Sequence, residues 1–164
     1  MLHLAMASAI MLAAGGASAS GVVWFYRLVE PRTPTLIYGV DESDDTPLIL
    51  RCGLRKGVAR LETDVDAPPP SPRAKSWPGV IKLKSGSVAA AVKAKVSANE
   101  ESGGDWAEGD VPLGAPILDA FRRSGRLTVV NGGAQQAFDA KSAAELSAIG
   151  SFFQACAARP GPKA

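Results

Sequence analysis

The chain has 164 residues, of which 46% are hydrophobic and 21% are charged, and its 18 basic and 16 acidic residues give a formal net charge of +2. This length suits a single domain, and the positive charges are too dispersed to follow a nucleic-acid backbone, so we expect no nucleic-acid partner. The only histidine, His3, lies in a segment that we expect to be removed, which excludes Ser-His-Asp and Cys-His catalysis and histidine-based zinc sites from the mature chain.

The first nineteen residues are typical of a secretory signal peptide. An apolar run over 4–14 is followed by Ala17-Ser18-Ala19, which places small residues at the cleavage position. The run is shorter than the about 20 apolar residues of a membrane-spanning helix. The segment begins without Lys or Arg, and an uncleaved anchor is the alternative. We therefore expect a signal peptide at 1–19, one periplasmic or secreted domain at 20–158 with no stable membrane span, and a disordered tail at 159–164.

The chain from residue 22 to residue 96 is rich in β-branched and aromatic residues between turn signals, a pattern that predicts strands. In 58–65, apolar-leaning residues alternate with charged ones, which is typical of a half-buried strand. Ser85-Gly86 predicts the tight turn of a hairpin, although a helix is the alternative for its alanine-rich second arm. The expected strands are 22–29, 35–40, 47–52, 58–65, 80–84 and 88–96.

Three polar segments predict connections between or after these strands. The acidic residues Asp41, Glu42, Asp44 and Asp45 could offer oxygen ligands to calcium, but the glycine and distant glutamate of an EF-hand loop are missing, so a solvated hairpin turn is the preferred interpretation. The proline-rich stretch 66–78 predicts a surface connection, with Trp77 folded back onto the sheet. Residues 99–110, which include Trp106 and three glycines, predict a loop.

Two helices are expected in the last third of the chain. Pro116 and Gly125 bracket the first helix as its opening turn and its C-terminal cap. A strand at 126–130 and a short edge piece near residue 138 follow. The second helix covers 142–157, where Ser142 and Glu145 fit a capping box. Its apolar residues recur at helical spacing and predict a buried stripe of Leu146, Ile149, Phe153 and Cys156.

The two cysteines predict one disulfide. Cys52 and Cys156 are an even pair in a chain that we expect to be exported, and an oxidising compartment favours a bridge over the alternative of two separate buried thiols. Strands joined in sequence, with helices late in the chain, predict the α+β class. We expect an antiparallel β-sheet with the C-terminal helix packed on one face, a shorter helix before the last strands, and one disulfide.

Four runs resemble, in their order, small exported proteobacterial proteins of uncharacterised type: PLILRC, VARLETDV, APILDAFRRSGRLTVV and AFDAKSAAELSAIGSFFQAC. The chain is more distantly similar to accessory proteins of type VI secretion loci, which share a strand-borne Arg-Cys and a C-terminal Ala-Cys helix. The match covers disulfide and core positions, and the chain departs from it in the proline-rich insertion. The resemblance implies an exported β-rich fold and transfers no catalytic residue.

No catalytic, cofactor-binding or metal-binding set stands out in the sequence. We expect a non-enzymatic exported domain that contacts an unknown protein partner, as a cell-envelope or secretion accessory. The alternative is a small-ligand binding protein or a hydrolytic enzyme without histidine. The candidate ligand or partner surface combines two tryptophans with lysines at strand spacing: Trp77, Trp106, Lys82, Lys84, Lys93 and Lys95.

Overall fold

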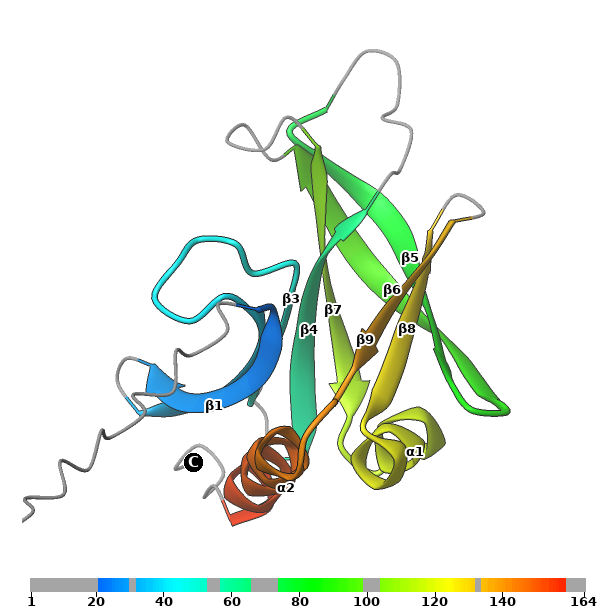
Figure 1. Ribbon diagram of the computed structural model, residues 1–164. Coiled ribbons are helices and arrows are strands. Elements are labelled where there is room, and N and C mark those ends of the chain that lie inside the picture. The colour runs from blue at the N-terminus through cyan, green and yellow to red at the C-terminus, as the bar shows by residue number, and fades with distance from the viewer. Residues whose placement is uncertain are drawn as a thin grey trace, which may run out of the picture.

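The computed structural model describes residues 21–29, 32–52, 57–65, 74–98, 104–131 and 134–158. These residues form one curled antiparallel sheet of nine strands and two helices (Figure 1). The elements are β1 (Val23–Val29), β2 (Thr33–Gly39), β3 (Leu48–Cys52), β4 (Val58–Val65), β5 (Ser76–Ser85), β6 (Val88–Ala98), β7 (Asp105–Pro112), α1 (Pro116–Ser124), β8 (Arg126–Asn131), β9 (Ala134–Asp139) and α2 (Ala143–Ala158). The expected signal peptide, tail and most of the proline-rich connection lie outside the described residues.

The strand order is β1-β2-β3-β4-β7-β6-β5-β8-β9. β1 to β4 follow one another across the sheet, whereas β5, β6 and β7 run in reverse, so that β7 pairs with β4 along its whole length, from Val58 opposite Pro112 to Val65 opposite Asp105. β5, β6 and β7 are three successive strands, and β4, which precedes them in the chain, lies beside β7. This is a Greek-key arrangement. The expected antiparallel sheet with two helices is therefore confirmed, although the fold is mostly sheet.

The strand β7 corrects the expectation of a loop over 99–110. Its alternate residues Ala107 and Val111 are buried, while Glu108 is less covered. Glycine and aspartate are poor strand formers, but pairing with β4 and β6 on both sides overrides that preference. Gly109 suits this place because a Cβ there would lie 2.7 Å from Cγ1 of Val92. The glycine that suggested a loop instead permits close packing inside a strand.

The hairpin of β5 and β6 confirms the expected turn and excludes the helical alternative for its second arm. β5 pairs with β6 from Ser76 opposite Ser97 to Ser85 opposite Val88. Gly86 adopts a positive φ of 58° in the turn, a conformation that glycine reaches without strain. Trp77 lies opposite Val96 and is buried in the core, which confirms that it folds back onto the sheet.

An aromatic cluster joins the first and last strands of the sheet. The ring of Trp24 on β1 lies 5.1 Å from the rings of Tyr38 and Phe121, and Tyr38 lies 5.1 Å from Phe138 on β9. The indole N–H of Trp24 also donates a hydrogen bond of 3.4 Å to the carbonyl oxygen of Phe138. The curl of the sheet therefore brings its two edge strands into contact around one tryptophan.

The helices begin and end largely as the sequence predicts. Pro116 opens α1, and Gly125 ends it in the left-handed conformation with φ of 67°. α2 lies against β1, β2 and α1 at one end of the sheet (Figure 1), rather than over one face of a flat sheet. The predicted stripe on α2 is wrong at Leu146, which is 46% exposed. The inward position one residue earlier belongs to Glu145, because its carboxylate bonds the backbone of β1.

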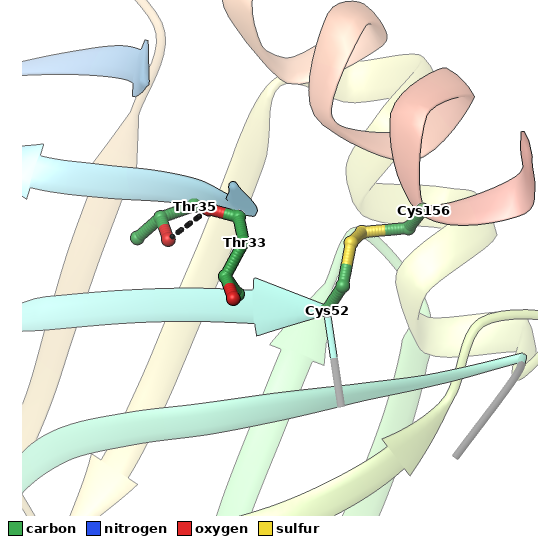
Figure 2. Close-up of a disulfide and its surroundings, with 4 residues drawn as sticks. All are labelled: Thr33, Thr35, Cys52 and Cys156. Carbon is green, nitrogen blue, oxygen red and sulfur yellow. Dashed lines mark hydrogen bonds between the residues drawn. A yellow bond between two sulfur atoms is a disulfide. The ribbon is translucent and has the colours of Figure 1, made fainter. Parts of the chain in front are cut away.

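The disulfide between Cys52 and Cys156 is confirmed. It joins the end of β3 to α2 across a sequence separation of 104 residues, with the two Cα atoms 5.4 Å apart. Figure 2 shows the bridge beside Thr33 and Thr35 of β2, whose own bond runs from Oγ1 of Thr35 to the carbonyl oxygen of Thr33 at 3.0 Å. Closing a loop of this length stabilises a fold by about 4 to 5 kcal/mol in the chain-entropy description.

Candidate functional site

The four lysines of the candidate surface emerge from one side of the β5–β6 hairpin. In the register, each lysine lies opposite a small or apolar residue on the neighbouring strand: Lys84 opposite Ala89, Lys82 opposite Ala91, Lys93 opposite Val80, and Lys95 opposite Pro78. Directly paired residues of antiparallel strands share a face, and alternate residues return to it. The intervening residues Ile81, Leu83, Val92 and Val96 are buried in the core. The lysines are therefore confirmed as co-facial and exposed.

Apolar side chains lie on the same side as the lysines. Val80 is 56% exposed, one of the most exposed large hydrophobic residues in the described chain. An open hollow of about 470 Å³ lies elsewhere, between β1 and α2, whereas a hollow of about 360 Å³ occupies the hairpin itself. The hairpin hollow is lined by Lys82, Leu83, Lys84, Ala89, Ala90, Ala91 and Val130. We name as the basic face the residues Lys82, Lys84, Lys93, Lys95, Val80, Ala89, Ala91 and Val130.

The two tryptophans of the predicted surface lie on opposite sides of the sheet. Trp77 pairs with Val96 and faces the core, so it is not part of the basic face. Trp106 pairs with Ser97 of β6 on the outward side, where it is half-buried. Val80 and Val130 were missed as surface residues in the sequence. The sequence could have shown this for Val80, because it is two residues from Lys82 and therefore faces the same side of the strand.

Acidic and arginine side chains on the neighbouring strands are already paired with one another. Nε of Arg60 lies 3.2 Å from Oδ1 of Asp110, and Nη1 of Arg60 lies 3.9 Å from Oε2 of Glu108. Nε of Arg51 lies 2.9 Å from Oε1 of Glu62. In contrast, the ion pairs found within the described ranges include none that involves a lysine of the basic face. These lysines are therefore exposed without an ion pair of their own in the described part of the chain, although Glu108 lies opposite Lys95 and Asp110 lines one hollow with Lys93.

The acidic turn between β2 and β3 is held by its own hydrogen bonds. Oγ of Ser43 donates to the carbonyl oxygen of Val40 at 3.0 Å, and the backbone N–H of Asp45 donates to Oγ of Ser43 at 3.1 Å. Among the residues with described positions, no three of His, Cys, Asp or Glu gather as metal ligands would. Burial raises the pKa of the nearby Asp64 carboxyl, and the negative charge of Asp45 raises this pKa further.

Glu145 and Ser142 perform a structural role at the start of α2. Oγ of Ser142 donates to Oε1 of Glu145 at 3.0 Å and accepts from the backbone N–H of Glu145 at 3.2 Å, which confirms the capping box. The backbone N–H of Lys141 also donates to Oε1, at 3.1 Å. Oε2 accepts from the backbone N–H of Trp24 at 3.1 Å. Both oxygens of this buried carboxylate therefore join α2 to its own cap and to β1.

No helix in the described ranges is long and apolar enough to cross a bilayer.

Known proteins offer no further guide to the basic face. Comparison of the chain with protein-family models, with curated proteins and with solved structures finds no match.

Proposed function

We propose that this chain is an exported, non-enzymatic domain that works by contact with a protein partner, as a cell-envelope or secretion accessory. The observation that supports this most strongly is the basic face. It presents four lysines without a described ion pair beside exposed aliphatic side chains, on the outer side of a hairpin whose inner side is packed into the core. Exposed apolar residues among polar ones are a common feature of contact surfaces.

The hollow on the basic face and the hollow between β1 and α2 suit contact better than enclosure of a small ligand. Ligand pockets are concave and collect a few polar groups around an apolar lining. The hollow of the basic face is an open one, and its lining consists of lysine, alanine, leucine and valine residues. The hollow between β1 and α2 contains Glu145, but both oxygens of this carboxylate already accept hydrogen bonds. A protein with a broad contact surface fits these two hollows better than a small substrate does.

Export is proposed from the signal-like segment at 1–19 together with the disulfide. Bridges between distant strands and helices persist in oxidising compartments. Intact mass of the protein recovered from cells, with and without reductant, tests both parts. Loss of 1–19 and a gain of two hydrogens on reduction are expected. A chain that retains 1–19, or whose mass is unchanged by reductant, would contradict the proposal.

Photocrosslinking in living cells tests the contact itself. A photoreactive amino acid replaces Val80 on the basic face in one strain and the exposed Gln136 on β9 in another. We expect a discrete protein adduct at position 80 that is absent at position 136, and the purified adduct partner should bind the isolated domain. Equal crosslinking at both positions, or an adduct whose purified protein shows no binding, would count against the proposal.

A further inference from the structure

The four lysines form a row with an even step along the hairpin axis. From the turn inward, successive levels of the register carry Lys84, Lys82, Lys93 and Lys95, with one lysine at each level. Each level is two residues from the next, which corresponds to about 6.8 Å in an antiparallel sheet. The row crosses from β5 to β6 between Lys82 and Lys93. It therefore extends over about 20 Å as a line of single positive charges rather than a compact patch.

An extended polypeptide repeats its side chains at the same step. In such a segment alternate residues point to one side, so acidic residues at every second position present carboxylates about 6.8 Å apart. Four carboxylates would then face the four lysines, with a sideways step of about 4.8 Å between β5 and β6 that the long lysine side chains can span. A compact anion such as a single phosphate would reach only one or two lysines of so long a row. The even step therefore favours a linear, strand-like partner segment.

The surroundings of the row also favour a polypeptide over other linear anions. Proteins that bind single-stranded nucleic acid stack bases on aromatic side chains. Small aliphatic residues flank this row instead: Val80, Ala89, Ala91 and Val130. The tryptophan on the same side of the sheet, Trp106 on β7, is half-buried and lies opposite Ser97, one level beyond Lys95, so it lies outside the row rather than within it.

Acidic side chains lie beside the row on its β7 side. Glu108 on β7 lies opposite Lys95, and Asp110 of the same strand lines one hollow with Lys93. Arg60 contacts both carboxylates, at 3.9 Å and 3.2 Å. On the other side, Thr128 and Val130 of β8 lie opposite Lys84 and Lys82. An acidic segment would therefore meet other carboxylates on the β7 side and uncharged residues on the β8 side, which favours its approach from the β8 side.

We propose that the basic face binds an acidic segment of a partner protein, held extended, whose Asp or Glu residues occupy alternate positions. This inference rests on the proposed contact function and names the chemistry of its partner. Lysine pairs exposed to solvent are individually weak, so binding depends on the sum of four and decreases as salt is raised.

The first test compares two fluorescent peptides of equal composition. One alternates serine with four glutamates, and the other carries the four glutamates in one block, so that only half of them face the lysines at a time when it is extended. Fluorescence anisotropy at low salt should show several-fold tighter binding of the alternating peptide. Equal affinity for the two peptides would overturn the inference, because charge alone would then explain binding.

The second test removes the charges one at a time. Lys84→Gln, Lys82→Gln, Lys93→Gln and Lys95→Gln should each weaken binding of the alternating peptide by roughly two- to fivefold, which is the range for one exposed ion pair. Lys141→Gln is the matched control, since Lys141 is exposed but lies next to α2. Affinity that is unchanged by substitutions in the row, or reduced equally by Lys141→Gln, would overturn the inference.

Two competitors separate the partner classes. Oligothymidylate and vesicles that contain phosphatidylglycerol are each added to the peptide complex at physiological salt, and neither should displace the alternating peptide at matched charge concentration. Displacement by either would reject a protein segment as the favoured partner. A position-80 crosslink in cells together with failed peptide binding would leave the contact function standing and reject the acidic-segment inference alone.

Discussion

Two regions of this sheet, β1–β3 and the β5–β6 hairpin, use their surfaces in opposite ways. β2 is buried on both faces from Pro34 to Gly39, and the β1–β3 region is further joined to α2 by the disulfide and by Glu145. The β5–β6 hairpin buries only its inner residues and presents lysines on its outer side. Residues of β2 are therefore constrained by packing on both faces. On the β5–β6 hairpin, only the inner face is constrained in this way.

The largest expected effect lies in the β1–β3 region. Cys156→Ala should lower the free energy of unfolding by about 4 to 5 kcal/mol, because the bridge to Cys52 closes a long loop. Urea denaturation of the oxidised protein measures this effect, and reductant should reproduce it in the unaltered chain. Cys52→Ala combined with Cys156→Ala should cost no more than the single change. An unaltered melting temperature in the variant would break the comparison at its strongest point.

The next effect concerns the carboxylate that joins α2 to β1. Glu145→Ala removes the acceptor of three hydrogen bonds, from the backbone N–H groups of Trp24 and Lys141 and from Oγ of Ser142. Loss of these partners at a buried position should cost about 3 kcal/mol in denaturant titration. Ser147→Ala, at an exposed position of the same helix, is the control and should change stability little. Equal effects of the two changes would argue that Glu145 is dispensable.

Packing under the β5–β6 hairpin is expected to be as strict as packing in the β1–β3 region. Gly109→Ala places a Cβ 2.7 Å from Cγ1 of Val92 and 3.0 Å from the carbonyl oxygen of Lys93, which should cost about 1 to 3 kcal/mol. Gly150→Ala on α2 meets nothing within 4 Å and should instead stabilise the protein by about 0.5 to 1 kcal/mol. Thermal melting of the two variants measures both effects. Melting temperatures that shift in the same direction would contradict this prediction.

The smallest effect is expected on the outer face. Changing Lys82 and Lys93 together to glutamine should leave the free energy of unfolding within about 0.5 kcal/mol of the original value, because neither side chain has a described ion pair and both are exposed. Thermal melting checks this result. A clear destabilisation would show that the basic face is part of the scaffold, and the distinction between the β1–β3 region and the hairpin would then fail.

Much of the fold could be predicted because local signals agree with the final structure. Pro116 and Gly125 bound α1, the Ser142 and Glu145 capping box starts α2, and the two cysteines pair. Each of these signals acts over a few residues or follows from a rule about cysteine pairing. Their agreement with the structure reflects local physical chemistry that does not depend on the strand order.

The errors arise where distant strands decide the outcome. β7 was expected as a loop because Asp105, Gly109 and Asp110 are weak strand formers, and only its neighbours β4 and β6 make it a strand. Leu146 was expected in the core, but a hydrogen bond from Trp24 places Glu145 inward instead. The lysines of the candidate surface were found by their spacing. The strand register was needed to show that lysines of β5 and β6 form one row with an even step.

The contact between the first and last strands also determines when the interior can be completed. Trp24 belongs to the first strand, whereas Phe138 and Cys156 come near the end of the chain. The ribosome delivers Trp24 long before the residues that enclose its indole ring and the cysteine that ties α2 to β3. The interior around Trp24 can therefore be completed only after α2 has been synthesised, so this part of the core forms late.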